Sequence, residues 1–420
     1  MDLYEELEWR GMMSEATEGL REALTAGRVT AYIGFDPTAD SLHVGSLLTM
    51  MGLARLQRSG HSPIAIVGGG TGMIGDPKPN QERPLLSRED IERNVAGIRP
   101  QLARLLDFDS PTNPARIVNN ADWLASFDLL GFLRDTGKYF TVNYLLQKEA
   151  VSRRLDSEEG ISFTEFSYPL LQARDYLELF DRFNCTLQMG GSDQWGNITA
   201  GIELVRKLRS TRVHGLVWPL LTTAAGTKFG KTEMGTVWLD PQRTSPFRFY
   251  QFWLNTDDRD AVRHLKLFTF MSRGEIDQLA EATASHPERR EAQRALARAV
   301  TALVHGEEHV QRAERAAQVL FAENIADASV DDVLMVFEDA PSTDLALPPE
   351  GMPLADMLAA VKLVSSKSEA MRLLKSGGVY VNNVRATDER ARLTAADAIG
   401  GSLFVLRKGR KDHHIVRVRS

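Results

Sequence analysis

The chain has 420 residues and a mass of 46.7 kDa, a length that predicts two or three domains. Hydrophobic residues make up 43% of the sequence and charged residues 25%, which excludes a mainly disordered, collagen-like or disulfide-stapled chain. The single cysteine, Cys185, excludes an intrachain disulfide, and no apolar run reaches the roughly 18 residues that span a bilayer. The acidic N-terminus lacks the basic and apolar regions of a signal peptide, so we expect a protein of the reducing cytoplasm.

The net charge of −6 is unevenly distributed along the chain. Residues 351–420 contain 13 Lys and Arg against 6 Asp and Glu, a surplus of +7, whereas the rest holds 37 against 50, or −13. An acidic body with a basic tail suggests an appended nucleic-acid contact. A solvated surface that happens to be basic explains the charge alone equally well.

The first 220 residues alternate short apolar or β-branched runs with helical patterns. Residues 29–35 predict a strand that enters a turn at Asp36-Pro37-Thr38, and residues 62–67 predict a second, buried strand. Between them, residues 46–59 place apolar side chains at helical spacing. A strand–helix–strand unit of about 35 residues is typical of a parallel sheet covered by helices, so the predicted fold class is α/β.

The pattern changes at about residue 246. Long helical stretches with few strand signals predict a separate helical domain; they cover residues 259–270, 272–284 and 287–306. Residues 338–353 are proline-rich and weakly patterned, which predicts a linker. The basic segment after it has about 65 residues, enough for a small independent module.

Two segments with candidate ligand-binding residues follow the two predicted strands. After the first strand, a turn and a helix start offer backbone amides to an anionic group such as phosphate. His43 could hydrogen-bond phosphate there, although a histidine beside a helix start often has a structural role, and Gly45 would let a base or ribose approach closely. The second segment, Gly68-Gly-Gly-Thr-Gly-Met-Ile-Gly-Asp76, matches neither a P-loop nor a strict dinucleotide fingerprint. Asp76 at its end is a candidate for a ligand ammonium group.

Two later segments complete the set of candidates. If residues 168–175 are helical, Tyr168, Gln172 and Asp175 share one face, which is odd for a core helix and favours a polar pocket wall. Close behind, Gly190-Gly-Ser-Asp-Gln-Trp-Gly-Asn197 supplies another strand-to-loop edge.

The last candidate segment contains Lys228 and Lys231, which stand three apart between Gly226 and Gly235. Such a pair could close over a polyphosphate and neutralise its growing charge. Lys-x-x-Lys by itself is usually only surface.

The order and spacing of these segments together resemble those of one protein family. His43-Val-Gly-Ser with Lys228-Phe-Gly-Lys-Thr resembles the paired signature segments of class I aminoacyl-tRNA synthetases. The Tyr-x-Gly-Phe-Asp-Pro-Thr-Ala-Asp-Ser-Leu-His run, the Gly-Gly-Ser-Asp-Gln-Trp-Gly-Asn segment and the 168–175 helix are similar to those of bacterial tyrosyl-tRNA synthetases. The resemblance covers essentially all 420 residues, and its C-terminal part is similar to the RNA-binding fold of ribosomal protein S-four.

The resemblance implies a particular domain order. A Rossmann-like parallel-sheet catalytic domain would occupy residues 1–245, including the Lys-Phe-Gly-Lys-Thr loop, and a helical anticodon-arm domain would occupy 246–330. A linker over 331–352 and a small α+β RNA-binding module over 353–420 would follow. The family further implies a cytoplasmic homodimer with no membrane contact.

The resemblance also assigns roles to individual side chains. Tyr32 and Asp175 would meet the phenol hydroxyl of L-tyrosine, Asp76, Tyr168 and Gln172 its α-ammonium, and Gln194 its carboxylate. The residues assigned to ATP are Asp36, Thr38, His43, Gly45, Ser46, Gly191, Asp193, Arg83, Lys228 and Lys231. The catalytic assignments are His43, Thr38, Lys228, Lys231 and Thr232, with Arg83 and the last three residues gripping pyrophosphate in the transition state.

The implied reaction has two steps. Tyrosine carboxylate attacks the α-phosphorus of ATP and expels magnesium pyrophosphate, and then a terminal ribose hydroxyl of tRNA(Tyr) displaces AMP. No permanently bound cofactor and no protein metal site is expected; Mg²⁺ would arrive with ATP, and catalysis would come from positioning and electrostatic stabilisation. Lys367, Arg372 and Lys375 could contact tRNA phosphates. The Arg206-Lys207-x-Arg209 cluster could meet the acceptor stem or could be a solvated helix end.

Two positions depart from the usual family pattern. Ser46 replaces a second histidine, at a cost of roughly 0.5–1.5 kcal/mol for one lost neutral hydrogen bond, and Ile33 stands where relatives often have cysteine.

Three other functions are less favoured. A tryptophanyl-tRNA synthetase is disfavoured by the pairing of Tyr32 with Asp175. A degenerate binding protein is encouraged only by Ser46, and another nucleotidyltransferase is disfavoured by the C-terminal extension.

Overall fold

The computed structural model describes residues 2–76, 85–155, 160–224, 226, 229–232, 235–409 and 412–419, with only the backbone at residues 231, 232 and 321. The chain divides into two compact units, Met1–Val304 and His305–Ser420. Among the described helices, none combines the length and the apolar character that crossing a membrane requires.

A six-stranded sheet forms the centre of the first unit, with the strand order β1-β6-β5-β2-β3-β4. All neighbours pair in parallel except β1, which is antiparallel to β6. The strands are β1 (Glu15–Ala16), β2 (Thr30–Phe35), β3 (Ser62–Val67), β4 (Arg116–Asn119), β5 (Cys185–Gly191) and β6 (His214–Trp218). The predicted α/β class with a parallel sheet is confirmed, and both predicted strands agree with β2 and β3 to within one residue.

The strand order changes direction between β2 and β5. From β2 the chain proceeds through β3 to β4 on one side of the sheet, while β5 and β6 lie on the other. In open parallel sheets, ligands bind beyond the carboxyl ends of the strands at such a switch point. The ends of β2 and β5 therefore mark the expected position of the site.

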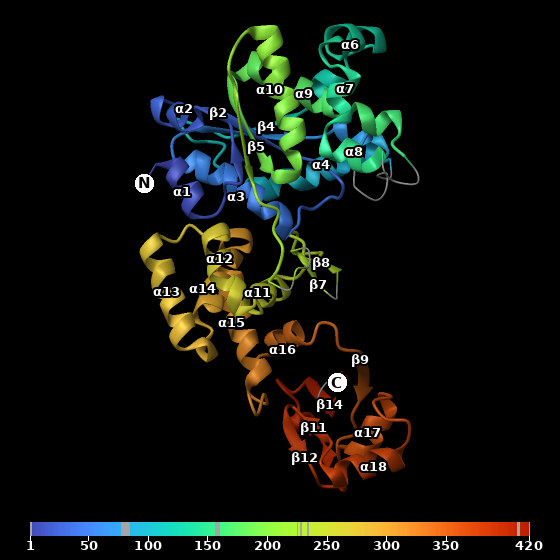
Figure 1. The fold of residues 1–420 in the computed structure, drawn as a ribbon. Helices are drawn as coiled ribbons and strands as arrows, with labels where there is room; N and C mark the ends of the chain where they lie inside the picture. Colours follow the sequence, from blue (N-terminus) through green and yellow to red (C-terminus); the bar gives the residue numbers. More distant parts are fainter. Residues whose placement is uncertain are drawn as a thin grey trace. The chain divides into compact units, whose positions relative to one another are not determined.

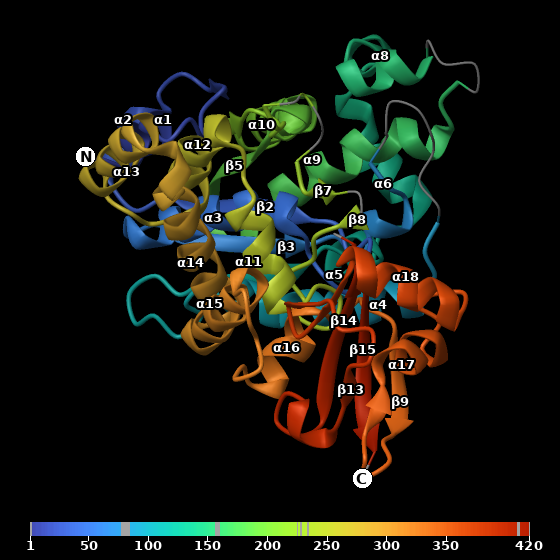
Figure 2. The same cartoon turned by 90° about the horizontal axis from the view of Figure 1, so that it is seen from below.

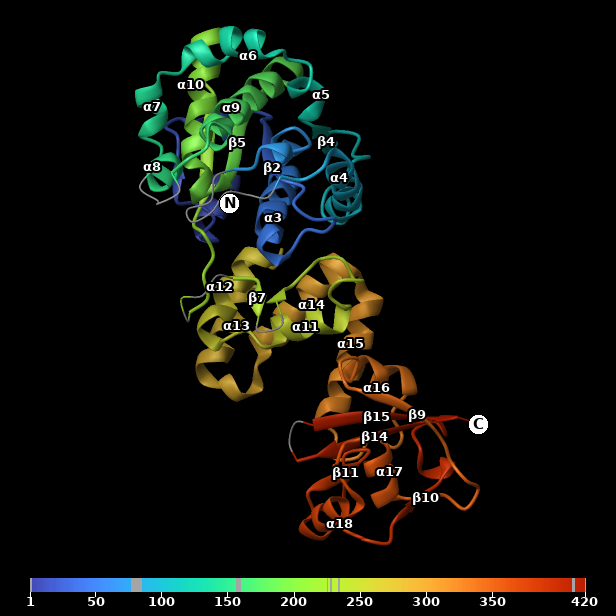
Figure 3. The same cartoon turned by 90° about the vertical axis from the view of Figure 1, so that its right-hand side faces the viewer.

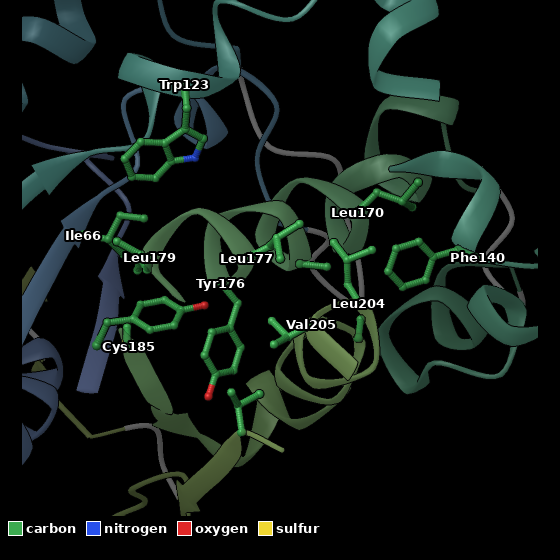
Figure 4. Close-up of a cluster of buried hydrophobic side chains, with 14 of the residues drawn as sticks. Ile66, Trp123, Phe140, Leu170, Tyr176, Leu177, Leu179, Cys185, Leu204 and Val205 are labelled. Atoms are coloured by element: carbon green, nitrogen blue, oxygen red, sulfur yellow. The ribbon is translucent and has the colours of Figure 1, made fainter. Parts of the chain in front are cut away.

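Long helices connect and cover these strands. α3 (Val44–Arg58) joins β2 to β3, α9 (Phe163–Phe183) leads into β5, and α10 (Trp195–Arg209) joins β5 to β6. α9 and α10 lie side by side (Figures 1 and 3). Figure 4 shows the buried side chains between them and the sheet, among them Tyr176, Leu177, Leu204, Val205 and Cys185. This apolar cluster fixes the position of the polar face of α9.

The ends of α9 have clear local causes. Ser162 accepts a hydrogen bond from the backbone N–H of Glu165, and the Glu165 side chain accepts one from the Ser162 backbone, which is a capping box. Asn184 ends the helix in the left-handed region at φ 51°. The other helices of this part are α1 (Leu3–Trp9), α2 (Leu20–Ala26), α4 (Arg88–Leu102), α5 (Ala121–Leu124), α6 (Leu129–Asp135), α7 (Val142–Leu146) and α8 (Glu149–Leu155).

The part of the first unit after residue 245 contains the predicted helices, in the same compact unit as the sheet and not as a separate one. It contains α11 (Pro246–Leu254), α12 (Asp258–Phe268), α13 (Arg273–Ser285) and α14 (Glu291–His305), which Figure 3 shows beyond the sheet. The helix predicted over 287–306 is interrupted, since a 3₁₀ turn (Pro287–Arg289) precedes Arg290 at φ 50°. The left-handed backbone at Arg290 ends the turn, and α14 starts after it.

A buried arginine connects α3 to α12. Arg55 is only 1% exposed, and its guanidinium donates to the carbonyl oxygens of Leu267 (3.0 Å), Lys266 (3.1 Å) and Thr269 (2.7 Å). Burial lowers the pKa of Arg55 to about 9. A cation at the C-terminal end of a helix also interacts favourably with the helix dipole, so this contact stabilises the attachment of α12.

His264 on α12 predicts an acid-sensitive contribution to stability. Its side chain is 2% exposed, and burial lowers its pKa from 6.5 to about 4. Because the unfolded chain takes up this proton below pH 6.5 and the folded chain only near pH 4, stability falls as pH drops through that window. The loss attributable to this residue is at most about 3 kcal/mol. Denaturant unfolding of the wild type and a His264→Leu variant at pH 7 and pH 4.5 measures it, and an identical pH dependence for the two would contradict the expectation.

The second unit is an α+β module. Its five-stranded sheet has the order β12-β11-β14-β15-β9, and β9 is parallel to β15 (Figure 2). The strands are β9 (Ser342–Ala346), β10 (Met352–Pro353), β11 (Val379–Val381), β12 (Val384–Ala386), β13 (Arg392–Leu393), β14 (Leu403–Lys408) and β15 (Asp412–Arg419). The helices are α15 (Glu307–Phe321), α16 (Val330–Val336), α17 (Leu354–Ala360) and α18 (Lys367–Ser376).

The structure corrects one sequence expectation in this unit. Residues 331–352, expected to be a linker, contain most of α16 and all of β9. β9 is an edge strand paired residue by residue with β15, from Ser342 opposite Ile415 to Ala346 opposite Arg419. Its five residues have half-buried and exposed side chains in alternation, too weak a pattern to stand out beside the neighbouring prolines.

Candidate active site

The predicted site residues converge at the carboxyl ends of three neighbouring strands. Asp36 directly follows β2, the glycine-rich segment ending at Asp76 follows β3, and residues 192–194 follow β5 as a 3₁₀ turn. The helix α9 contributes Tyr168, Gln172 and Asp175 to the same site. These segments are far apart in sequence, and the parallel sheet brings them to one edge.

One end of the site contains a buried carboxylate and a buried phenol, close enough for the charge of one to raise the pKa of the other. Asp175 is 3% exposed and accepts hydrogen bonds from the Trp123 indole N–H (2.7 Å) and from Asn120 Nδ2 (2.9 Å). Burial raises the pKa of Asp175 to about 7, against the opposing effect of these two donors. Tyr32 on β2 is 1% exposed, and no described residue forms a hydrogen bond with its hydroxyl oxygen.

The same environment keeps the Tyr32 hydroxyl protonated. Burial raises the pKa of Tyr32 well above 10, and the negative charge of Asp175 adds to the effect. The phenol is therefore a donor at every working pH, and the carboxylate is an acceptor when ionised. A ligand hydroxyl is the group that satisfies both at once, because it accepts from one and donates to the other.

A chain of hydrogen bonds leads away from Asp175. Asn120 Nδ2 also donates to Thr71 Oγ1 (2.9 Å), Thr71 Oγ1 lies 3.4 Å from Asp36 Oδ1, and the Tyr168 hydroxyl lies 3.4 Å from Asp36 Oδ2. A side chain at position 68 would disrupt this chain, since a Cβ on Gly68 would come within 2.6 Å of both Thr71 and Asp36. Residues assigned to the amino acid and to ATP are thus directly connected.

A second network surrounds Asp76. Its carboxylate accepts from Gln194 Nε2 (2.9 Å) and from Asn197 Nδ2 (3.2 Å), and Gln194 Oε1 in turn accepts from Gln172 Nε2 (3.2 Å). The predicted neighbours Asp76, Gln172 and Gln194 are therefore brought together. An anionic carboxylate with polar neighbours is suited to bind an ammonium group.

The start of α3 gives His43 a defined role. Its Nδ1 accepts from the backbone N–H of Ser46 at 3.2 Å, so the ring proton lies on Nε2, which is then a donor. The structure supplies a reason for Gly45: a Cβ there would lie 2.7–2.9 Å from the His43 ring. Gly45 therefore makes room for the histidine cap, and the close approach of a base or ribose at this glycine stays a prediction.

The structure describes some of the remaining assigned residues. Thr38 is exposed just after β2, and Asp193 is exposed beside Gly191, where a Cβ would lie 2.5 Å from the Asp193 carboxylate. Lys231 and Thr232 lie on the short strand β7 (Lys231–Thr232), which pairs with β8 (Gly235–Thr236). Arg83 and Lys228 lie outside the described residues.

The sequence analysis did not identify four residues of these networks: Thr71, Asn120, Trp123 and Asn197. Thr71 and Asn197 lie inside segments that were singled out, so only their individual roles were missed. Asn120 and Trp123 follow β4, and a search of every strand end would have found the Asn-Asn-Ala-Asp-Trp run there.

Comparisons with known proteins agree with this geometry. Residues 24–322 match the family model of class I tRNA synthetases (W and Y), and residues 332–416 match that of a tyrosine–tRNA ligase C-terminal domain. The tyrosine–tRNA ligase of Roseiflexus castenholzii is 54% identical, covering 99% of both chains. That of Geobacillus kaustophilus is 50% identical, covering 99% of this chain and all of the relative.

A solved structure gives the same result for the fold. A C-terminally truncated mitochondrial tyrosyl-tRNA synthetase of Aspergillus nidulans matches with a TM-score of 0.69 and 32% identity, covering 76% of this chain and 94% of that one. The family resemblance inferred from the signature segments is confirmed. With relatives about half identical over its whole length, this chain belongs to the tyrosine–tRNA ligase family of class I tRNA synthetases.

Proposed function

We propose that this chain activates L-tyrosine with ATP and transfers the tyrosyl group to the terminal ribose of tRNA(Tyr), in the cytoplasm. The observation that carries the proposal is the pair formed by Tyr32 and Asp175, a buried donor and a buried acceptor at the inner end of the site. A phenol hydroxyl between them satisfies both. The family relationship supports the same reaction.

In the proposed activation step, the protein supplies positioning and charge. The tyrosine carboxylate is already anionic, so no protein nucleophile or general base is required to attack the α-phosphorus. Asp76, Tyr168 and Gln172 hold the α-ammonium, while the phenol contacts fix the other end of the substrate. Because these contacts hold the substrate at both ends, they also fix the orientation of the reacting carboxylate.

The phosphates of ATP lie, in this proposal, against the start of α3 and the Lys-Phe-Gly-Lys-Thr segment. His43 offers its Nε2–H, and the amides of the first turn of α3 add the positive end of the helix dipole. Lys228, Lys231 and Thr232 stabilise the departing pyrophosphate, and Mg²⁺ enters as part of the nucleotide substrate.

Selection of tyrosine over phenylalanine follows from burial. Phenylalanine would leave the buried Tyr32 hydroxyl without a partner, and Asp175 would keep the Asn120 and Trp123 donors but lose the one from the ligand. A buried unsatisfied group costs about 1–3 kcal/mol and a hydrogen bond to a charged group contributes about 1.5–3 kcal/mol, so together they give a discrimination of about 10² to 10⁴.

Pyrophosphate exchange with tyrosine, tryptophan and phenylalanine tests the proposed function. Exchange that depends on tyrosine supports it. Exchange that depends on tryptophan would indicate the related tryptophan enzyme, and no exchange with any of the three would indicate an RNA-binding protein without catalysis.

The helical segment and the second unit are the proposed tRNA-binding parts. Lys367, Arg372 and Lys375 are exposed on α18, although Lys367 is paired with Asp356 at 2.6 Å. The Arg206-Lys207-x-Arg209 cluster of α10 is paired with Glu203 and Asp181, so much of its charge is already neutralised. The exposed basic residues of α18 are therefore the better candidates for phosphate contact.

A homodimer is also part of the proposal, because apolar side chains gather on one stretch of the first unit. Twelve large apolar side chains are exposed in the described residues, and seven of them lie between residues 129 and 163. They are Leu129, Leu130, Leu133, Val142, Leu146, Leu155 and Phe163. Six of them lie on α6, α7 and α8, which lie beside α9 in Figures 1 and 3, and Phe163 is the first residue of α9. Patches of this kind commonly mark protein interfaces.

A Phe163→Asp variant is expected to dissociate this dimer. Phe163 is 74% exposed, so a charge is tolerated in the free subunit but costs several kcal/mol when a partner covers it. Light scattering after gel filtration should give the dimer mass for the wild type and half of it for the variant. Val384→Asp, at a 47% exposed position of the second unit, is the matched control and should remain dimeric. A monomeric wild type would refute the proposed dimer.

A further inference from the structure

The turn between β2 and α3, residues 36–43, carries three of the side chains assigned to ATP: Asp36, Thr38 and His43. Residues 36–42 lie outside the helices and strands, so no ladder of regular hydrogen bonds fixes their backbone. Backbone N–H and C=O groups that are buried in such a turn need partners from other segments. The contacts that supply these partners therefore determine where the three side chains lie.

One face of α4 contacts this turn at both ends. Asn94 is 6% exposed and donates from Nδ2 to the carbonyl oxygen of Pro37 (2.9 Å). Gln101 Oε1 accepts from the backbone N–H of Leu42 (2.9 Å), and Gln101 Nε2 donates to the carbonyl of Gly97, one helical turn earlier (3.1 Å). Positions 94, 97 and 101 have the spacing i, i+3 and i+7, so they share one face of the helix.

Gly97 lets the backbone of α4 touch the middle of the turn. A Cβ at this position would lie 2.1 Å from the carbonyl oxygen of Asp40 and 3.0 Å from its carbonyl carbon. Both are backbone atoms, so no side-chain rotation can relieve the contact. A glycine inside a helix is less stable than an alanine, and the close approach of the turn supplies the reason for glycine here.

A second segment, residues 239–240, also holds the turn. The backbone N–H of Leu239 donates to the carbonyl of Leu42 (2.9 Å), and that of Asp240 donates to the Ser41 hydroxyl oxygen (3.1 Å). The N–H of Leu42 is thus bound by α4 and its carbonyl by Leu239. Ser41 and Leu42 are both buried, so this end of the turn has little freedom to move.

We propose that one face of α4 positions the 36–43 turn for the nucleotide, with Asn94, Gly97 and Gln101 as its positioning residues. The inference rests on the ATP-binding role proposed for the side chains of this turn. Asn94 and Gln101 fix the two ends of the turn, and Gly97 sets the distance between its middle and the helix. None of the three is among the residues assigned to a substrate, so they act on ATP through the turn.

Gly97→Ala is expected to lower kcat/KM for ATP in tyrosine-dependent pyrophosphate exchange by about 10²-fold. The added methyl group has to move the Asp40 carbonyl from 2.1 Å to the 3.0 Å that Cβ contacts require. A misplacement of about 1 Å has an effect of that size. The dissociation constant for tyrosine, measured without ATP, should stay within threefold, because the residues proposed for tyrosine lie outside this turn.

The matched control is the same substitution at a helical glycine with free space around it. Gly274 lies on α13, and a Cβ there would meet no atom within 4 Å. Gly274→Ala should therefore keep kcat/KM for ATP within twofold of wild type.

Variants of Gln101 test the inference without a steric clash. Gln101→Met has a similar length and removes the acceptor of the Leu42 N–H, so kcat/KM for ATP should fall about tenfold, the effect of one lost hydrogen bond. Gln101→Glu keeps an acceptor oxygen and should recover most of the loss. A general loss of folded protein would lower tyrosine binding as well and would give no recovery with glutamate.

The outcomes separate this inference from the proposed function. A value of kcat/KM for ATP within threefold of wild type for either Gly97→Ala or Gln101→Met would overturn the inference, as would an equal loss of tyrosine binding. If His43→Ala left kcat/KM for ATP unchanged, the assignment of the turn to ATP would fail, and the inference with it. No tyrosine-dependent exchange by the wild type would instead refute the proposed function.

Discussion

Asp175→Ala is expected to lower kcat/KM for tyrosine in pyrophosphate exchange by about 10²- to 10³-fold. The variant removes a hydrogen-bond acceptor that is only 3% exposed. A hydrogen bond to a charged group contributes about 1.5–3 kcal/mol, and the Asn120 and Trp123 donors lose their partner as well. The effect should be confined to tyrosine, with the KM for ATP nearly unchanged.

A variant on the same helix provides the control for Asp175→Ala. Asp181 on α9 is partly exposed and paired with Arg209, outside the site, so Asp181→Ala should keep kcat/KM within twofold. Asp175→Ala should also reduce the preference for tyrosine over phenylalanine, because the acceptor that recognises the hydroxyl is gone. Unchanged activation of tyrosine by Asp175→Ala would mean that the phenol binds elsewhere.

Removing the second unit from residue 323 onward, which leaves only its first helix α15, is expected to abolish tRNA charging and to spare tyrosine activation. A chain ending at residue 322, where the synthetase family match ends, retains every residue proposed for activation. Its exchange rate should stay within threefold of wild type, while charging of tRNA should fall by at least 10³-fold with the loss of the basic module. Exchange and charging assays on the same preparation measure both.

The position of the cut matters because of the fold of the second unit. A cut at residue 351 would leave β9 without β15 and would expose an apolar group, Val319, Ile325, Val333 and Phe337, whose partners lie after residue 398. Aggregation of that fragment would obscure the result.

Charge reversal in the intact chain gives an independent test of the module. Arg372→Glu with Lys375→Glu on α18 should weaken tRNA binding and reduce its salt dependence. Arg88→Glu on α4, 80% exposed, is the control for a surface charge change. Normal charging by both the truncated chain and the double variant would refute the role given to the second unit.

The sequence was most informative where a residue acts through its own chemistry. Asp76 and Asp175 were singled out as ligand-binding candidates from their own segments, whereas Tyr32 was assigned through the family resemblance. The fold places Asp76 after β3, Asp175 on α9 and Tyr32 on β2. Asn120 and Trp123 were not found because they act by orienting Asp175, more than 50 residues away, from a four-residue helix without periodicity. Their role depends on tertiary contact and has no local signal.

The boundaries of helices and strands were likewise predicted well where they depend on local sequence and poorly where they depend on distant contacts. β3 was predicted to the residue because its apolar run is buried on both faces. β9 was read as part of a linker because its pairing partner lies about 70 residues later in the chain. The break before α14 depends on the left-handed backbone of Arg290, a conformation that a non-glycine residue rarely adopts.

The hydrogen-bonded chain from Tyr168 through Asp36, Thr71 and Asn120 to Asp175 has a thermodynamic consequence. In the proposed assignment, the amino acid contacts Tyr168 and Asp175 at the two ends of this chain, and the nucleotide contacts Asp36, its second member. Binding of one substrate should therefore change the affinity for the other. Thermodynamic linkage requires that the affinities for tyrosine and for ATP change by the same factor. Tyrosine and ATP should consequently bind as a thermodynamically linked couple, whichever of them arrives first.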